Sequence, residues 1–324
     1  MSSTTIVVSP RERYSSLIYS LKSLFASVDA SVPIIVVDAG SPKSVRQDIE
    51  KLKLTRPFKH IKLDYPLMPN EARNAGARHV ETEYIIFTDN DIEYAPNWLE
   101  ELETSAIQYK TDAVAPLTLI GPSDKKKIHH AGGIIKKNKN NNQLQIKEIH
   151  RFADQYLIDC EEKLRNSDMI FHDVAEFHCM LMRRSAYDAI GGLDERLITQ
   201  EQIDVGLRFK ELGLRMSFNR KSIITYRAYD SFTLEDLQYH FFRWSDRLAK
   251  NSVEAFNQSW NTNQNVKKIR FMWIRKHRER AIATAFPRTR KILGKHLFRY
   301  FFCAYFEWKF DKFENGRRKS LMEV

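Results

Sequence analysis

The first ninety residues alternate short, continuous apolar runs with longer segments in which apolar residues recur every three or four positions. Continuous runs rich in Val and Ile are typical of strands buried on both faces, and a spacing of three or four is typical of helices that bury one side. The alternation predicts a parallel β-sheet with helices on both faces. We expect strands at residues 5–9, 32–37, 61–63 and 84–88, and helices at residues 14–27, 43–54 and 70–79.

The same two patterns continue beyond residue 90, although less regularly. A polar stretch at residues 123–147, rich in Lys and Asn, is expected to form a hairpin or a mobile loop. After Ser231 the pattern is helical and strongly aromatic. We therefore expect an α/β domain at residues 1–232 and a helical C-terminal extension at residues 233–324. Further helices are expected at residues 97–110, 185–190 and 203–212, and further strands at residues 113–116, 177–182, 215–219 and 223–226.

The composition fits one large domain with an appendage, since the chain has 324 residues of which 43% are hydrophobic. Its three cysteines, Cys160, Cys179 and Cys303, are widely spaced and form no CxxC pair, which indicates a reducing compartment. The start of the chain lacks the pattern of a signal peptide, and no apolar run reaches the length of a membrane-spanning helix. We expect a cytoplasmic protein that is soluble or peripheral on the cytoplasmic face of a membrane.

The net charge of +11 is concentrated at the end of the chain. From Lys267 onward there are 17 Lys and Arg against 5 Asp and Glu, whereas the preceding residues hold 35 against 36. These basic residues alternate with aromatic ones, which favours an interfacial helix on an anionic membrane. A helical cap packed on the first domain or on a second subunit is the next interpretation, and a homodimer is one form of it. Nucleic acid comes last, because no recognised fold for it is present.

Two carboxylates, Asp89 and Asp91, directly follow the apolar run at residues 84–88. Open α/β sheets bind their ligands at the carboxyl ends of their strands, and hard oxygen ligands on a short turn suit Mg²⁺ or Mn²⁺ together with substrate phosphates. The alternative is simple turn chemistry, which also favours Asp and Asn.

Several separated motifs, taken in order, resemble those of the family 2 glycosyltransferases. The resemblance covers roughly residues 4–260 and implies a GT-A fold, a Rossmann-like, mostly parallel sheet flanked by helices. It also implies inverting transfer of a sugar from a nucleotide-diphosphate sugar, with a divalent cation, to a hydroxyl of a glycan or lipid-linked acceptor. The motifs are Val36 to Ser41, Glu71 to Gly76, Phe87 to Asp91, Cys179 to Arg184 with Ile190 to Glu195, and Glu201 to Arg208.

The resemblance assigns nucleotide contacts to the ends of the first two strands. Asp38 is expected to contact the nucleotide, although an Asx turn into Ser41 explains it as well. Pro10 and Arg11 stand where the family contacts nucleotide, and Arg11 is alternatively a solvated loop charge.

The resemblance also assigns the diphosphate and the metal. Arg73 and Asn74 are expected near the diphosphate, with an exposed helix Arg as the alternative for Arg73. Asp89 and Asn90 are counted among the donor contacts, and Asp89 and Asp91 are expected to hold the metal. Of these two carboxylates, Asp91 is the stronger candidate for direct ligation.

The catalytic base departs from the family pattern. The family's usual base is the Asp of a Glu-Asp pair, but here Gln202 stands at that position, and an amide cannot accept the proton. We assign the base to Glu201, with Asp204 second. The alternative is that both acids favour a helix N-terminus through its dipole. A non-catalytic nucleotide-binding protein is therefore one rival function. A sugar nucleotidyltransferase is another, although the glycine-rich loop it needs after the first strand is missing.

A further metal ligand is left open, because the stretch at residues 224–230 lacks the His that family members often supply. His172, His178 and His240 are substitutes, but a single His without a paired ligand is more often structural, and we assign none of them. His129 and His130 are adjacent, so on a strand they point in different directions and seldom share an ion. We interpret them as turn chemistry near the rim of the active site.

Overall fold

The computed structural model describes residues 3–122, 125–140, 143–166, 170–228, 231–269 and 273–312. Four residues of the expected hairpin, 123, 124, 141 and 142, lie outside the described residues. So do residues 270–272 and 313–324 of the expected extension.

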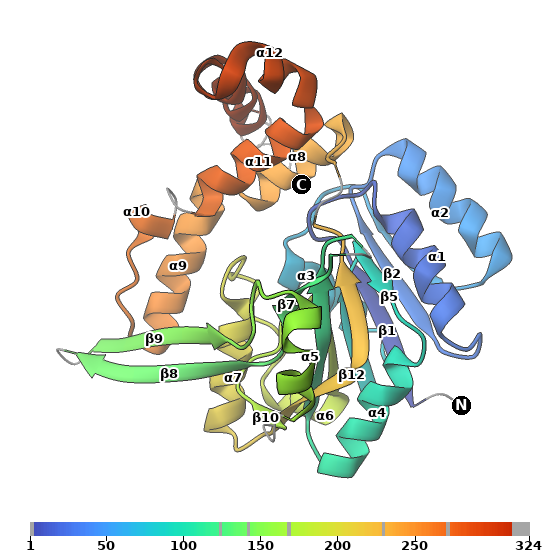
Figure 1. Ribbon diagram of the computed structural model, residues 1–324. Helices are drawn as coiled ribbons and strands as arrows, with labels where there is room; N and C mark the ends of the chain where they lie inside the picture. The colour runs from blue at the N-terminus through green and yellow to red at the C-terminus, as the bar shows by residue number, and fades with distance from the viewer. Residues whose placement is uncertain are drawn as a thin grey trace.

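A ten-stranded sheet forms the centre of the molecule (Figure 1). Along its main path the strands are hydrogen-bonded in the order β10-β12-β6-β11-β4-β1-β2-β3, with β5 paired to β12 and β7 paired to β6. The strands are β1 (Thr4–Ser9), β2 (Ile34–Ala39), β3 (Lys59–Leu63), β4 (Tyr84–Asp89), β5 (Ile92–Tyr94), β6 (Ala113–Ile120), β7 (Lys127–His130), β10 (Phe171–His172), β11 (Cys179–Arg183) and β12 (Met216–Tyr226). A separate hairpin consists of β8 (Gly133–Asn140) and β9 (Gln143–His150).

The expected parallel arrangement is confirmed for the first four major strands, since β1 pairs in parallel with β2 and β4, and β2 with β3. The sheet as a whole is mixed, because β11 runs antiparallel to both β4 and β6. The two strands expected at residues 215–219 and 223–226 are one strand, β12, with a register shift between Asn219 and Ile223. The polar stretch forms a hairpin, as one of its two interpretations predicts.

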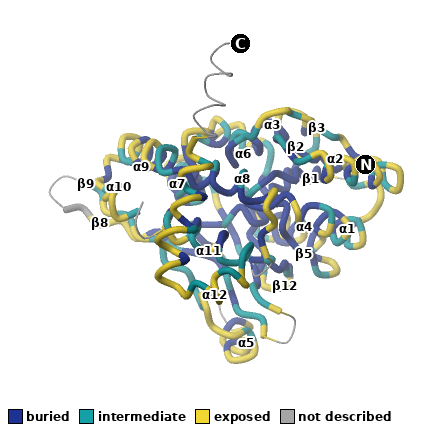
Figure 2. The backbone as a smooth tube through the Cα atoms, turned by 90° about the horizontal axis from the view of Figure 1, so that it is seen from above, coloured by how far each residue is buried: buried dark blue, intermediate teal, exposed yellow. Residues whose placement is uncertain are grey.

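Helices cover both faces of the sheet because the side chains of each strand alternate between two cores. On β1, Ile6 and Val8 pack with α1, α2 and α4, whereas Val7 packs with α3, α6 and α7. These helices are α1 (Leu17–Ser27), α2 (Lys43–Thr55), α3 (Pro69–Ala77), α4 (Trp98–Tyr109), α6 (Arg184–Ala189) and α7 (Glu201–Glu211), and α5 (Leu157–Arg165) lies near β7. Dark, buried strands surrounded by partly exposed helices show the same layering in Figure 2.

The C-terminal helices lie above the carboxyl edge of the sheet in Figure 1. The Tyr239 hydroxyl on α8 shares its one proton between the carbonyls of Pro10 (3.2 Å) and Leu67 (3.1 Å), so α8 packs directly on the loop after β1. The division at residue 232 stays a prediction. The remaining elements are α8 (Leu234–Arg243), α9 (Asp246–Trp260), α10 (Val266–Ile269), α11 (Arg275–Ala285), α12 (Pro287–Leu297) and a π-helical turn (Phe298–Cys303).

The aromatic residues of the extension divide into two groups. Phe298 and Phe306 are buried with Phe241 of α8 and Ile282 of α11 in a small core of their own. Others are exposed on the outer side, together with the cations of α12. Among the described residues, no helix combines the length and the apolar character needed to cross a membrane.

Candidate active site

Most of the sequence-predicted site residues meet at the carboxyl ends of β1 and β4, which are neighbours in the sheet. The register pairs Ser9 with Asp89, so the loop after β1 lies beside the turn after β4. Asn90 joins the two segments, because its side chain accepts a hydrogen bond from the Arg11 amide (3.1 Å) and donates one to the Arg13 carbonyl (2.6 Å). Asn90 is buried, and these bonds give it a positioning role.

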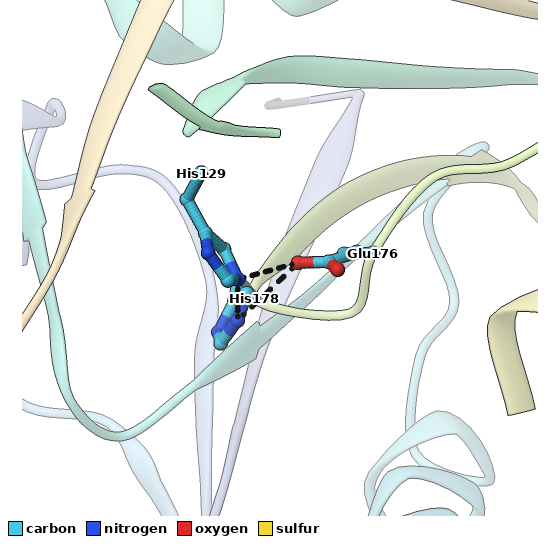
Figure 3. Close-up of side chains that lie close together, drawn as sticks. All are labelled: His129, Glu176 and His178. Carbon is cyan, nitrogen blue, oxygen red and sulfur yellow. Dashed lines mark hydrogen bonds and ion pairs between the residues drawn. The ribbon is translucent and has the colours of Figure 1, made fainter. Parts of the chain in front are cut away.

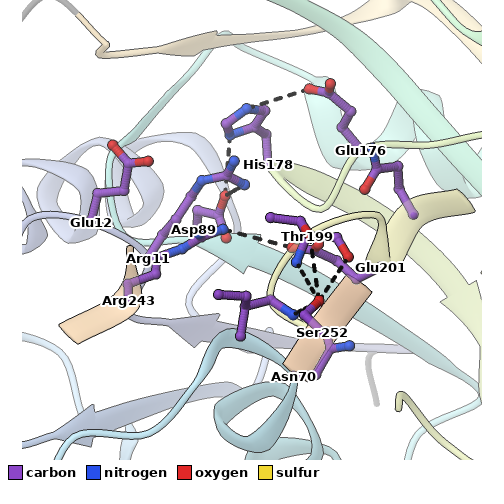
Figure 4. Close-up of polar contacts among 12 residues, drawn as sticks. Arg11, Glu12, Asn70, Asp89, Glu176, His178, Thr199, Glu201, Arg243 and Ser252 are labelled. Atoms are coloured by element: carbon purple, nitrogen blue, oxygen red, sulfur yellow. Dashed lines mark hydrogen bonds and ion pairs between the residues drawn. The ribbon is translucent and has the colours of Figure 1, made fainter. Parts of the chain in front are cut away.

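Asp89 is the most heavily paired carboxylate of the site (Figure 4). Its Oδ2 lies 2.9 Å from Arg11 Nη1 and 3.1 Å from His178 Nδ1, and its Oδ1 lies 3.1 Å from Arg73 Nη2. Burial by itself would raise the pKa of Asp89, but Arg11, His178 and Arg73 hold it well below its ordinary value. Asp89 is therefore ionised, with both oxygens already engaged.

Asp91 has the same burial and far fewer partners. Its Oδ2 lies 3.3 Å from Arg13 Nη1, while its buried Oδ1 has no hydrogen-bond partner among the described residues. Burial and the nearby charge of Asp89 raise the pKa of Asp91 to about 7, against the opposing effect of Arg13. A buried carboxylate oxygen left without a partner is costly unless a cation or donor reaches it. Asp91 thus fits direct metal ligation better than Asp89 does.

His178 completes the set of groups able to hold a cation at this edge. Asp89, Asp91 and His178 each offer a ligand atom within 4.8 Å of the others, and all three are buried. Carboxylate oxygens and one imidazole nitrogen suit Mn²⁺, so these residues fit the divalent cation expected from the sequence. The sequence assigns no role to His178, because a single His without a paired ligand is more often structural. Its position directly before β11, which pairs with β4, brings it to Asp89.

Arg73 lies in the site, whereas Asn74 does not. Arg73 is fully buried, stacks over the ring of Phe177 (4.2 Å) and extends between Asp89 and Glu201. Asn74 instead contacts the segment after α6: its Nδ2 donates to the Leu193 carbonyl (2.8 Å), and its Oδ1 accepts from the Leu193 amide (3.1 Å). A nucleotide contact by Asn74 stays a prediction that these contacts do not favour.

Asp38 is buried at the end of β2 and is neutralised by protein groups. Its Oδ1 accepts a hydrogen bond from the Ser41 amide (3.0 Å), which is the Asx turn weighed from the sequence. Its Oδ2 lies 3.0 Å from Arg46 Nε and 3.4 Å from His60 Nε2. Burial opposes ionisation, but contacts from His60, Ser41 and Arg46 hold the pKa of Asp38 below its ordinary value. The nucleotide role of Asp38 stays a prediction.

The two candidate bases occupy different surroundings at the start of α7. Glu201 Oε1 lies 3.7 Å from Arg73 Nη1 and 3.8 Å from Arg243 Nη2, so it faces the Asp89 cluster. Asp204 turns away, since its carboxylate binds Arg208 (3.0 Å) and accepts a hydrogen bond from Trp260 Nε1 (2.8 Å). Burial raises the pKa of Asp204. Of the two, Glu201 is the one that the fold brings to the Asp89 cluster.

Gln202, at the position of the missing acid, contacts a carboxylate from elsewhere in the chain. Its Nε2 donates a hydrogen bond to Glu148 Oε2 (3.2 Å) on the hairpin strand β9. The other oxygen of Glu148 lies 3.1 Å from His150 Nε2. No local sequence signal connects residues 148 and 202, and only the folded hairpin brings them together.

The C-terminal helices contribute side chains to the site. Trp244 Nε1 donates a hydrogen bond to Glu12 (3.2 Å), and Arg243 reaches Glu201. Burial by itself would raise the pKa of Glu12, but its surroundings, His240 first and then His277, Arg11 and Arg243, hold it well below its ordinary value. The end of α8 and the residue after it therefore contact the site and the loop after β1, and Figure 4 shows Glu12 and Arg243 close to Arg11.

Comparison with known proteins supports the resemblance. The family model described as glycosyl transferase family 2 matches residues 5–191. No match to a curated protein is found. The solved structure of GalNAc-T7 with UDP, GalNAc and Mn²⁺ is similar over 92% of this chain and 58% of its own, with a TM-score of 0.54 and 16% identity.

A second similar structure is the mannosyltransferase PcManGT from Pyrobaculum calidifontis in complex with GDP-Man and Mn²⁺. It matches 99% of this chain and 87% of its own, with a TM-score of 0.52 and 12% identity. At these identities the likeness shows the fold, and it confirms the expected GT-A type with a helical C-terminal region. Because the family model spans more than half of the chain, the protein belongs to glycosyl transferase family 2.

Proposed function

We propose that this family 2 enzyme transfers a sugar, with inversion at the anomeric carbon, from a nucleotide-diphosphate sugar to a hydroxyl of a glycan or lipid-linked acceptor. The observation that carries the proposal is the free, buried Oδ1 of Asp91 beside Asp89 at the carboxyl edge of the sheet. Mn²⁺ or Mg²⁺ bound there would neutralise the diphosphate leaving group. Both similar structures hold Mn²⁺ with a nucleotide or nucleotide sugar, which supports the same pairing here.

Two arginines position the proposed cation site. Arg11 and Arg73 occupy both oxygens of Asp89 and so fix the turn that carries Asp91. Arg11 is partly exposed, with about a fifth of its side chain accessible, so it is also placed to meet the donor diphosphate. The hairpin of β8 and β9, whose Glu148 reaches Gln202, is the segment that we propose covers the bound donor.

Glu201 is our proposed catalytic base, and Asp204 is second because Arg208 and Trp260 occupy its carboxylate. A non-catalytic nucleotide-binding protein remains the second candidate, since Gln202 replaces the usual acid and is held by Glu148. Glu201→Gln separates the two functions. Loss of turnover with unchanged donor binding supports the base, whereas a wild-type chain that binds donor without turnover supports the second candidate.

The outer surface of the extension supports peripheral membrane binding. We define this outer surface by the exposed side chains of α12 and of the segment after it. A basic and aromatic surface of this kind fits an anionic membrane, where aromatic rings enter the interface and cations meet lipid phosphates. Its apolar members are Ile292, Leu297, Tyr300, Phe301, Tyr305 and Trp308, and its cations are Arg288, Arg290, Lys291 and Lys295.

The donor proposal is tested by thermal stability with UDP-, GDP- and dTDP-sugars, each with Mn²⁺ and with EDTA. A ligand that binds only the folded state stabilises it by about 2.7 kcal/mol at a hundred times its Kd. We expect a metal-dependent shift with one nucleotide class, and its loss in Asp91→Asn. Asp48→Asn on α2, which changes an exposed carboxylate, is the matched control. Equal shifts in wild type and Asp91→Asn would contradict the assigned cation site.

A further inference from the structure

A second group of potential metal ligands lies on the far side of His178 from Asp89. It consists of His129 on β7 together with Glu176 and His178, which precede β11 (Figure 3). The three donor atoms form a triangle: His129 Nε2 to Glu176 Oε2 is 3.0 Å, His178 Nε2 to Glu176 Oε2 is 3.4 Å, and the two Nε2 atoms are 3.2 Å apart.

The size of this triangle matches a coordination polyhedron. A tetrahedral zinc ion with bonds of about 2.0–2.1 Å separates its ligand atoms by about 3.3–3.4 Å, and octahedral bonds of about 2.1–2.2 Å give about 3.0–3.1 Å. The three observed edges fall between these two cases. Two imidazole nitrogens and one carboxylate form a set that favours first-row transition metals over Mg²⁺.

Hydrogen bonding alone leaves this cluster incomplete. Glu176 Oε2 is buried and forms no well-directed hydrogen bond among the described residues, although two imidazole nitrogens lie within 3.4 Å of it. The two imidazole Nε2 atoms share one hydrogen bond, and Glu176 Oε2 contacts both rings only as an ion pair, so a cation between the three atoms would satisfy all of them.

Asp89 lies beside the other ring nitrogen of His178. The Nδ1 of His178 is 3.1 Å from Asp89 Oδ2 without a well-directed hydrogen bond, and the nearby carboxylate favours the tautomer with the proton on Nδ1. The Nε2 lone pair then faces His129 and Glu176. A carboxylate behind a metal-binding imidazole is the usual outer partner that fixes the ring and raises its basicity. The ring of Tyr226 packs against His178 at 4.1 Å and further limits its rotation.

The cluster also has access for an ion. The side chains of His129 and Glu176 are 30% and 17% exposed, whereas His178 is buried. The neighbouring His130 does not join, since it is buried and its ring meets His150 at 5.5 Å. The two adjacent histidines thus point in different directions, as we expected, but His129 belongs to a cluster rather than to a turn.

We propose that His129, Glu176 and His178 form a second metal site, which binds a transition-metal dication such as Zn²⁺ with solvent completing the coordination. His178 then belongs to this site through Nε2, and the donor cation at the sheet edge relies on Asp91. The site does not depend on the proposed sugar transfer, because it is defined by protein ligands alone.

The test uses the full-length, metal-stripped protein without nucleotide and Co²⁺ as a visible probe, with Zn²⁺ as competitor. We expect one Co²⁺ per chain with the intense ligand-field bands of a low-coordinate site, displaced by Zn²⁺ and not by excess Mg²⁺. His129→Ala and Glu176→Gln should weaken binding by about 100-fold or more, since loss of an outer partner alone costs 10–100-fold. His79→Ala, which removes an exposed histidine on the protein surface, should bind as wild type does.

Asp91→Asn separates the two sites, because it removes the proposed donor-cation ligand and leaves the triangle intact. Retained Co²⁺ binding in Asp91→Asn supports a distinct site. Three results would overturn the proposal: no stoichiometric Co²⁺ binding by wild type, unchanged binding in both His129→Ala and Glu176→Gln, or loss of binding in Asp91→Asn. His129→Ala lies at a partly exposed position and Glu176→Gln is isosteric, and circular dichroism of each checks that it is folded.

Discussion

The carboxyl edge of the sheet and the outer surface of the C-terminal helices both carry charge, but in opposite ways. At the sheet edge, Arg73 and Asp89 are fully buried and paired within 3.1 Å. On the outer surface, Lys291 and Lys295 are exposed beside exposed apolar side chains such as Ile292 and Leu297. Buried charges define a small site of fixed geometry, whereas exposed charges next to aromatics suit an extended, deformable partner. Charged side chains therefore suit different kinds of partner according to whether they are buried or exposed.

The largest effect on stability is expected from Arg73→Met, at the carboxyl edge of the sheet. It keeps the length of the side chain but leaves Asp89 and Glu201 without their shared cation. Removal of one partner from a buried ion pair costs about 3–5 kcal/mol, and we expect a loss of that size in the free energy of unfolding measured with denaturant. Arg78→Met, at the exposed end of the same helix, should change it by less than about 0.5 kcal/mol. Similar losses in both variants would mean that the inner pairing is no stronger than a surface charge.

Within the extension, Phe298 and Phe301 lie three positions apart in the sequence, but one is in the core and the other is on the surface. Phe298 is 3% exposed in the core shared with α8 and α11, whereas Phe301 is 63% exposed. We expect Phe298→Ala to cost about 3 kcal/mol, near the lower end for a buried aromatic, because this core is small. Phe301→Ala should leave the stability nearly unchanged. Chemical denaturation of both variants measures the difference, and equal costs would remove the distinction between inner and outer aromatics.

Acid should weaken the contact between the two regions through His240. Burial lowers the pKa of His240 to about 3, although the nearby Glu12 raises it, while His277 and Arg13 act with burial. Its ordinary pKa is about 6.5, so the unfolded chain binds the proton first. The stability that neutral His240 contributes is present above pH 6.5 and is lost as the pH falls toward 3. Its Nε2 donates a hydrogen bond to the His277 carbonyl, so a second proton would bind at Nδ1. That nitrogen is buried and has no hydrogen-bond partner among the described residues.

The measurement is the free energy of unfolding at pH 7 and pH 5. The wild type should lose up to about 2 kcal/mol more than His240→Gln between these values, since one pKa unit corresponds to about 1.4 kcal/mol. His296→Gln, at an exposed position on α12, should behave as wild type does. Identical pH dependence in wild type and His240→Gln would show that other groups control the acid response.

The first half of the fold and the Asp89–Asp91 pair could be predicted because their signals are local. Consecutive apolar residues indicate a buried strand, and Asp89 and Asp91 directly follow such a run. The expected strands at 32–37 and 84–88 correspond to β2 and β4 within a few residues. Local patterns do not predict that Asp89 is more heavily paired than Asp91, because the partners of Asp89 come from three other segments. These partners are Arg11, Arg73 and His178.

The remaining contacts depend on pairings between distant segments. His178 reaches Asp89 because β11 inserts antiparallel beside β4, and Glu148 reaches Gln202 because the hairpin folds toward α7. Arg46 and His60 neutralise Asp38 from the next helix and strand. None of these partners belongs to the same helix, strand or turn as the residue that it contacts. Predicting side-chain contacts across a sheet requires the order and register of its strands, which cannot be read from a single sequence.

The smallest effect on folding, and the sharpest test of the outer surface, is expected from Lys291→Gln combined with Lys295→Gln. Both side chains are exposed on α12, so the free energy of unfolding should change by less than about 0.5 kcal/mol. Each cation near an anionic bilayer contributes about 1 kcal/mol, so the pair should weaken binding to phosphatidylserine-containing vesicles by about thirtyfold, and added salt should shrink the difference. Lys22→Gln with Lys59→Gln, two exposed lysines of the α/β domain, is the matched control. Vesicle binding that both double variants reduce equally would indicate general charge attraction, and the distinction between an inner site of fixed geometry and an outer surface proposed to bind membranes would then fail.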